Sequence, residues 1–212
     1  MRIEQPAGHK GSLRWMQRAV NGAPRCLQPA ALPPLTWVSP LAGDGFAEYR
    51  DGDFLRRLGL GHLAPALSDF WPARGPQWDG LARFDGGVVL AEAKAHLREF
   101  DTPPSAAGPA SARRIETAFA RVQAALGVTP AAPWDRTFYQ YANRIAHLWW
   151  LRAQGINAHL VLIGFLHDPD LNGPATAADW HTAIAGAEAA LGLTPNPLAA
   201  AIHSLHPDVR EL

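Results

Sequence analysis

The spacing of apolar residues predicts three long helices in the second half of the chain. Residues 111–126 carry apolar side chains three and four positions apart, between Ser111, which can cap a helix, and a glycine that can end it. Residues 135–154 repeat this pattern behind Asp135, a second capping residue. Residues 176–191 begin with the spacing of a capping box, which predicts the third helix.

Shorter helices are predicted from weaker patterns. Residues 12–20 begin with Ser12, which can cap a helix, and end before an Asn-Gly pair, which favours a short helix with a defined stop. Residues 46–58, 63–70 and 197–205 are also predicted to be helical.

Strands are predicted where apolar residues alternate or run together between turn residues. Residues 78–84 and 88–96 flank Asp-Gly-Gly, the sequence of a tight hairpin turn. Residues 157–165 form an apolar run of strand length. A hairpin followed by two helices, a strand and a helix is typical of an α/β sandwich with a mixed sheet flanked by helices.

Composition places the chain among ordinary globular proteins. The chain has 212 residues, of which 48% are hydrophobic, and a length of this order suits one domain with its own core. We predict a helix and a Pro/Ala-rich arm over residues 1–36 and one α/β domain over residues 37–212. Cys26 is the single cysteine, which excludes an internal disulfide framework.

The sequence gives no reason to expect a membrane protein. No apolar signal core is present at the N-terminus, and the longest apolar run is far too short to span a bilayer, so we expect a cytoplasmic protein. Phosphate-binding loops, dinucleotide-binding fingerprints, zinc-protease motifs and serine-hydrolase elbows are also absent from the sequence.

Charge is distributed unevenly although the total is zero. Residues 158–212 contain six acidic residues and one arginine, so they carry −5 and residues 1–157 carry +5. This difference is either chance surface charge or the mark of a polyanion-binding surface in the first three quarters of the chain. Only Lys10 and Lys94 are lysines, against 17 arginines. For each lysine we therefore ask what it can do at its position that an arginine cannot.

Asp79, Glu92 and Lys94 are three of the ionisable residues on the predicted hairpin. Side chains alternate along a strand, so Glu92 and Lys94 share one face and the alanines between and around them lie on the other. A Gly-Gly loop would place Asp79 opposite Lys94, whereas an Asp-Gly loop would place it opposite Glu92. Either register brings Asp79, Glu92 and Lys94 together on one face.

Such a trio suits metal-assisted hydrolysis. Two neighbouring carboxylates repel each other unless a cation lies between them, and carboxylate oxygens suit Mg²⁺ or Mn²⁺. The backbone carbonyl of Ala93 can add a third ligand. A lysine ammonium is a compact charge that can orient or activate a water molecule, which an arginine does less well. The other interpretation is an exposed hairpin with a surface ion-pair cluster.

Asp79 followed by Glu92-Ala93-Lys94 resembles the motif of the PD-(D/E)xK nuclease superfamily, whose restriction-endonuclease-like fold is a central mixed sheet flanked by helices. The motif itself covers some 20 residues, and the order of elements agrees over about residues 40–170. Pro76 stands three residues before Asp79 rather than next to it. The resemblance implies an endonuclease or exonuclease in which Asp79 and Glu92 bind Mg²⁺ or Mn²⁺ and Lys94 assists the attacking water.

The resemblance also implies supporting residues outside the hairpin. The family often adds an acidic residue from the preceding helix, which Glu48 can supply, with Asp51 and Asp53 as weaker rivals. Polar residues on a later helix correspond to Gln140 and Arg144, which share a helix face and alternatively form an ordinary polar surface.

Several other polar residues have both a functional and a structural interpretation. His96 continues the face of Lys94 and either contacts substrate or ends the strand. The segment 167–170 is read as a turn rather than a metal site, and Trp71 as a core residue rather than a base-stacking platform. Arginines 98, 113, 114 and 121 form either a phosphate-binding rim or a solvated face.

Two functions are therefore expected from different classes. The first is a metal-dependent hydrolase that cleaves the phosphodiester bonds of DNA or another nucleic acid. The alternative is a non-catalytic module that keeps the nuclease fold and binds nucleic acid or protein. Nucleic acid is the expected partner, with a homodimer or a partner protein left open by the sequence.

Overall fold

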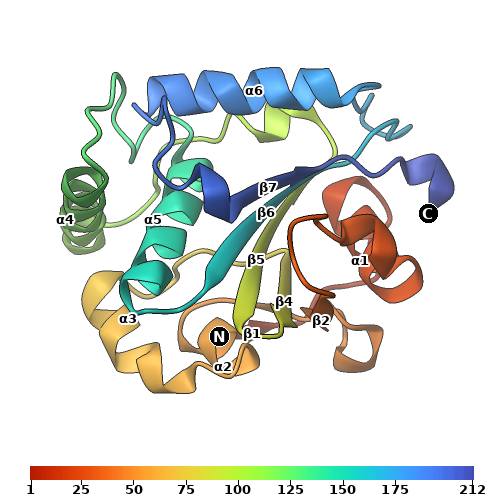
Figure 1. Cartoon of the computed structure of the whole chain (residues 1–212), viewed down its shortest axis with the longest axis horizontal. Helices are drawn as coiled ribbons and strands as arrows, with labels where there is room; N and C mark the ends of the chain where they lie inside the picture. The colour runs from red at the N-terminus through yellow and green to blue at the C-terminus, as the bar shows by residue number, and fades with distance from the viewer.

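The computed structural model describes all 212 residues as an α/β fold with a mixed five-stranded sheet flanked by helices (Figure 1). The strand order is β2-β4-β5-β6-β7, in which the first three strands are antiparallel neighbours and the last three are parallel neighbours. A separate two-stranded sheet pairs β1 with β3. The strands are β1 Arg2–Ile3, β2 Thr36–Ser39, β3 Glu48–Tyr49, β4 Gly80–Phe84, β5 Gly87–Lys94, β6 Ala158–Gly164 and β7 Ile202–Leu205.

Helices of very different length cover the two faces of the sheet. Figure 1 shows α1 on one side and α4, α5 and α6 on the other, with α2 and α3 beside the lower end of the sheet. None of the helices is long and apolar enough to cross a membrane. The helices are α1 Gly11–Gly22, α2 Gly52–Arg57, α3 Ala64–Phe70, α4 Pro109–Leu126, α5 Tyr139–Ala153 and α6 Ala177–Ala190.

Strand β5 divides the core into two hydrophobic clusters. Its residues Val89, Ala91 and Ala93 face α1, and Val88 and Leu90 face the larger cluster that contains α4 and α5. This alternation is the period of two that any strand imposes on its side chains. Because Glu92 follows the same alternation as Leu90, it points to the α5 side of the sheet.

Small residues let α1 lie close to the sheet. A side chain at Gly80 would place its Cβ 2.3 Å from Cε of Met16 and 2.7 Å from the ring of Trp37. Trp15 and Met16 on α1 are buried against the alanine face of β5. The alanines on either side of Glu92 therefore serve helix packing, while Glu92 itself faces the opposite layer.

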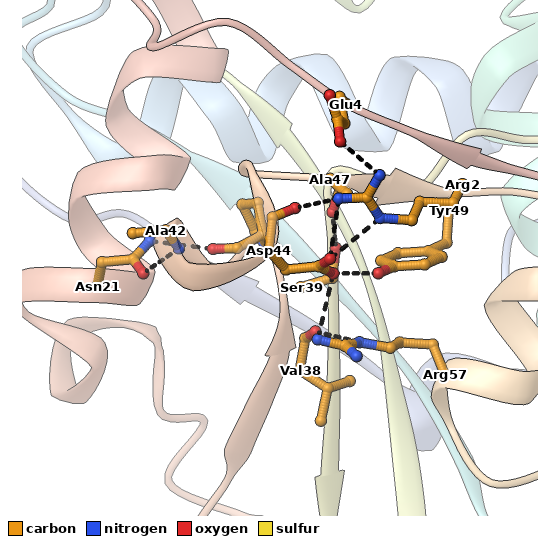
Figure 2. A network of polar contacts seen from close by, with 11 residues as sticks. Arg2, Glu4, Asn21, Val38, Ser39, Ala42, Asp44, Ala47, Tyr49 and Arg57 are labelled. Carbon is orange, nitrogen blue, oxygen red and sulfur yellow. Dashed lines mark hydrogen bonds and ion pairs between the residues drawn. The ribbon is translucent and has the colours of Figure 1, made fainter.

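A polar network holds the two-stranded sheet against β2 (Figure 2). Asp44 accepts hydrogen bonds from Tyr49 and from Nε of Arg2, the latter at 3.0 Å, and lies 3.4 Å from a guanidinium nitrogen of Arg57. Arg57 in turn donates to the carbonyl of Val38 at 2.7 Å. These bonds fix β3, and with it Glu48, relative to the main sheet.

Most long elements match the sequence-based expectations. Helices α4, α5 and α6 and strand β6 lie within one to four residues of the expected bounds, and Thr176 caps α6 as expected. The expected capping residues of the other two helices are wrong: Gly108 precedes α4 and Phe138 precedes α5.

Two predicted helices are wrong. Residues 46–58 form β3 and the short α2, because positive φ angles of 48° at Phe46 and 53° at Asp51 interrupt any continuous helix. Residues 197–205 form a short 3-10 turn followed by β7, whose backbone hydrogen bonds are made with the distant β6.

Candidate active site

The hairpin register places Asp79 and Glu92 opposite each other. Phe84 pairs with Gly87 and Gly80 pairs with Ala91, so the two-residue loop is Asp-Gly, the second of the two expected registers. Continuing this register by one step places Asp79 across from Glu92. The carboxylate of Asp79 accepts a hydrogen bond from the backbone nitrogen of Ala93 at 2.8 Å through Oδ2, which fixes the side chain at this position.

Glu92 and Lys94 form an ion pair on the face of β5 that α5 covers. Their closest atoms, Oε1 of Glu92 and Nζ of Lys94, are 2.6 Å apart. Both side chains are shielded from solvent, with exposed fractions of 6% for Glu92 and 13% for Lys94. The structure thus brings together the trio that the sequence singled out.

Helix α5 adds the two polar residues expected from it. Gln140 accepts a hydrogen bond from Nζ of Lys94 at 2.6 Å, and one turn later Nε of Arg144 donates to Oε2 of Glu92 at 2.6 Å. Since the two residues are four positions apart, one face of the helix reaches two residues of the strand below.

Arg144 is held from several sides. Besides its bond to Glu92, its guanidinium donates to the carbonyl of Gln77 at 2.8 Å and to the side chain of Asn143. The guanidinium carbon also lies 4.7 Å from the ring centroid of Trp78, a cation–π distance. Gln77, Trp78 and Asn143 were not singled out in the sequence, because nothing local in a sequence shows which partner a buried arginine will have.

Glu48 joins the site from β3 and not from a helix. Its Oε2 accepts hydrogen bonds from the amides of Gln5, at 3.0 Å, and Gln77. The bridge between Tyr49 and Trp78 places β3 beside the start of the hairpin. Gln5 lies more than 40 residues away in the sequence, so its contact could not be read from a local pattern.

The buried carboxylates repel one another. Burial raises the pKa of Asp79 well above its ordinary value, and the negative charges of Glu92 and Glu48 raise it further, against the opposing charge of Lys94. Burial also raises the pKa of Glu48, against the hydrogen bond from Gln77, and the charge of Glu92 adds to this rise. Ionisation of all three carboxylates would leave one more negative charge than Lys94 and Arg144 neutralise, so burial and repulsion both favour the protonated form of Asp79.

Glu92 and Lys94 remain charged despite their burial. Burial opposes ionisation of Glu92, but Arg144 and Lys94 together hold its pKa below the ordinary value. Burial likewise opposes the charged form of Lys94, yet Glu92 and Asp79 hold its pKa above the ordinary value. Lys94 is thus an ammonium in this arrangement, and it acts as a positive charge and a hydrogen-bond donor.

The donor set suits a hard divalent cation. Oδ1 of Asp79 accepts no hydrogen bond, and Oε1 of Glu92 is buried beside Lys94 without hydrogen-bond geometry. In a strand the N–H and C=O of one residue point the same way, so the carbonyl of Ala93 lies on the edge where Asp79 binds its N–H. The chain has no group of three or more His, Cys, Asp or Glu side chains that could hold a metal ion, so the backbone carbonyl of Ala93 would have to complete a site formed by Asp79 and Glu92.

The site is closed on one side and borders a polar cleft on the other. Trp180 of α6 packs on Gly164, the β6 partner of Lys94, where an added Cβ would lie 2.5 Å from its ring. On the other side a cleft of about 430 Å³ is lined by loop residues 74–77 and 102–104 and by the first turns of α5, including Gln140 and Arg144. These two helix residues stand between the cleft and the charged residues of β5.

His96 lies just beyond the end of the strand. Strand β5 ends at Lys94, and Nδ1 of His96 accepts a hydrogen bond from the backbone nitrogen of Arg98 at 2.9 Å. His96 thus caps the 3-10 helix of residues 97–99.

The segment 167–170 forms a turn, as expected. Asp168 is buried, and its carboxylate accepts hydrogen bonds from Nε1 of Trp15 at 2.6 Å and from the backbone nitrogens of Asp170 and Leu171. These bonds consume the oxygens that a metal would need.

Comparison with known proteins adds no assignment to this geometry. No family model, curated protein or solved structure matches the chain. The interpretation of the site therefore depends on its own residues.

Proposed function

We propose that the chain is a metal-dependent nuclease-like hydrolase that cleaves phosphodiester bonds in DNA or another nucleic acid. The observation that carries this proposal is the position of Asp79 opposite Glu92, with Lys94 paired to Glu92 on the same strand. The similarity of this trio to the PD-(D/E)xK motif, and a mixed sheet flanked by helices, support the same proposal.

Asp79, Glu92 and the carbonyl of Ala93 would hold Mg²⁺ or Mn²⁺. When bound, such a cation polarises a phosphoryl oxygen and lowers the pKa of a coordinated water. It would also favour the ionised form of Asp79, whose pKa is raised by burial and by the neighbouring carboxylates. Glu48 lies close enough to influence Asp79 electrostatically and would accept a proton.

Lys94 would act as an electrostatic and positioning group. Its pKa is raised by its acidic neighbours, so it is an ammonium that donates hydrogen bonds and not a base that accepts a proton. An ammonium beside a scissile phosphate stabilises the negative charge that develops in the transition state. Gln140 orients this ammonium through its side-chain oxygen.

Arg144 would have a double role. It holds the carboxylate of Glu92 in place, and it also lines the polar cleft from which a phosphate could approach. The net charge of +5 over residues 1–157 is of the sign that a nucleic acid requires.

Cleavage of plasmid and single-stranded DNA with Mg²⁺ or Mn²⁺ tests the proposal. Asp79→Ala and Lys94→Ala should each abolish metal-dependent cleavage, whereas Lys10→Ala, at the other lysine, should leave it intact. Cleavage that survives both substitutions in the trio would mean that Asp79 and Lys94 are not catalytic.

A second candidate function is a non-catalytic nucleic-acid-binding module. The specific observation in its favour is that Glu92 is paired with both Lys94 and Arg144, so its charge is already compensated within the chain. Under this alternative the purified protein binds DNA equally well with and without divalent cations and cleaves none. The Lys94→Ala variant would then bind DNA more weakly than the wild type, and neither protein would cleave it.

A further inference from the structure

A cavity of about 220 Å³ lies one helical turn along α5 from Arg144. Its walls come from α2, α3, α4, α5 and the loop that follows α3, and include Asp51, Ser68, Trp71, Arg114 and His147. Gly75 lines both this cavity and the polar cleft beside the candidate active site. The cavity is therefore a neighbour of that site but contains none of its charged residues.

The cavity wall contains an acceptor that makes no hydrogen bond within the chain. Nδ1 of His147 lies 2.8 Å from the carbonyl of Asn143, and since a carbonyl can only accept, Nδ1 carries the hydrogen. Burial lowers the pKa of His147 to about 3, so the ring is neutral at pH 7 and its Nε2 is a free acceptor. His147 is 1% exposed, and Nε2 makes no hydrogen bond within the chain.

A donor without a partner lines the same cavity. The indole of Trp71 packs against the ring of His147, with 4.8 Å between the ring centroids, and its Nε1 hydrogen bonds to nothing in the chain. A Cβ added to Gly75 would lie 3.1 Å from Cδ1 and 3.6 Å from Nε1 of Trp71. The polar edge of the indole thus faces Gly75, and the absence of a side chain at that position leaves it open.

The wall opposite is held in a strained shape. Asp51 has a φ of 53° and Arg74 a φ of 66°, a region that residues other than glycine seldom adopt. The carboxylate of Asp51 accepts hydrogen bonds from the backbone nitrogens of Arg74, at 3.3 Å, and Gly75, at 2.9 Å, and so fixes both strained residues. Strain of this kind is commonly kept where a ligand binds.

We infer that this cavity binds a nucleobase, whose N–H group donates to Nε2 of His147 and whose ring nitrogen or carbonyl accepts from Nε1 of Trp71. A donor next to an acceptor on the edge of a flat ring is common to all the nucleobases. The volume is below the roughly 300–1,000 Å³ of pockets for drug-sized ligands, which suits one heteroaromatic ring system. Arg114, at the same cavity, supplies a positive charge for the attached phosphate.

This inference rests on the proposed function for the source of the base, a nucleotide of the strand that enters the neighbouring cleft. A free nucleotide presents the same donor and acceptor to the cavity as a nucleotide within a strand. A comparison of a mononucleotide with a short oligonucleotide that ends in the same base separates the two sources, because only the strand can fill the cavity and the cleft together.

Calorimetric titration with the four nucleoside monophosphates in EDTA, with ribose 5-phosphate as the ligand without a base, tests the inference. At least one nucleotide should bind much more tightly than ribose 5-phosphate. Gly75→Val, which fills the cavity, should abolish that binding, whereas Gly43→Val, at a glycine with open space around it, should not. Trp71→Phe keeps the ring but removes the donor and should weaken binding about 3- to 10-fold.

Three results would overturn the inference. They are equal binding of the nucleotides and ribose 5-phosphate, absence of nucleotide binding, and unchanged binding in a folded Gly75→Val protein. If Gly75→Val does not fold, Trp71→Phe decides the question. The binding measurement involves neither metal nor cleavage, so the two proposals can fail separately. If nucleotides bind but DNA is not cleaved, only the proposed function is refuted. If DNA is cleaved in a way that requires Lys94 but nucleotides do not bind, only the cavity inference is refuted.

Discussion

Two carboxylates of this protein contact guanidinium groups in contrasting surroundings. Asp44, with a side chain 24% exposed, lies between Arg2 and Arg57 and accepts a hydrogen bond from Tyr49 (Figure 2). The hydrogen bonds from Tyr49 and Arg2 hold the pKa of Asp44 below its ordinary value, although partial burial of the side chain opposes this lowering. Glu92, with a side chain 6% exposed, shares its cations with two further acidic residues whose pKa values are raised.

The difference lies in the balance of charge. Around Asp44 the positive charges are sufficient, so the network stabilises the fold and needs nothing from outside. Around Glu92 three carboxylates face two cations in a buried setting, so ionisation of all three would leave a negative excess, which burial and repulsion make unfavourable. An unfavourable charge that a fold retains is a mark of a functional site, because an added cation or substrate relieves it.

The largest expected effect comes from Arg144→Ala. Removal of this guanidinium leaves Glu92 buried without one of its two cations, which should lower the free energy of unfolding by about 3–5 kcal/mol. Urea unfolding measures this loss, with Arg113→Ala on the exposed face of α4 as the control. Millimolar Mn²⁺ should restore more stability to Arg144→Ala than to the wild type. A loss below about 1 kcal/mol would show that Arg144 is not needed to compensate Glu92.

The next effect concerns Lys94→Arg, which keeps the charge and changes its shape. A guanidinium is planar and larger than an ammonium, so it cannot occupy the position between Glu92 and Gln140. Metal-dependent DNA cleavage should fall by about 10²–10³-fold, the usual loss for one donor that stabilises transition-state charge. Wild-type cleavage rates in this variant would mean that only net charge matters at position 94.

Asp79→Asn should stabilise the metal-free protein at neutral pH. The folded-state pKa of Asp79 lies above its unfolded value, so the folded protein binds the proton more tightly, and the ionised carboxylate costs stability as pH rises above about 4. The asparagine has no such cost and still offers an oxygen to the backbone of Ala93.

The difference in melting temperature between Asp79→Asn and wild type should therefore be positive at pH 7 and shrink as the pH falls toward 4. Each kcal/mol regained corresponds to about 2–4 °C for a chain of this size. Thermal unfolding in EDTA across this pH range measures it. A difference that is independent of pH would show that the charge of Asp79 is not the cause.

The smallest effect is expected for Asp44→Asn. The side chain is partly exposed, so loss of its ion pairs should cost no more than about 1 kcal/mol, and less at high salt. Chemical unfolding at low and high salt measures this difference. A loss as large as that for Arg144→Ala would remove the contrast between the two clusters.

The sequence predicts the long elements and the trio because the information for them is local. A glycine-rich turn sets the hairpin, and the alternation along β5 separates Glu92 and Lys94 from the alanines that pack against α1. Glu48 shows the limit of such reasoning. Its two-residue strand exists only because β1 and Trp78 pair with it, and no local pattern records those partners.

Arg144 shows the same limit inside the site. Its spacing from Gln140 shows that the two share a helix face, but its bonds to Glu92 and Gln77 span 52 and 67 residues of sequence. His96 is placed by a local contact instead, since its own ring caps the 3-10 helix that follows the strand.

We propose that the buried carboxylates Asp79 and Glu92, between β4 and β5, form a divalent-cation site. Titration with Mn²⁺ followed by electron paramagnetic resonance tests this most directly, with the wild type compared with Asp79→Asn and Glu92→Gln. We expect one bound Mn²⁺ in the wild type and a loss of that binding in both variants. Equal Mn²⁺ binding by all three proteins, or none by the wild type, would contradict it.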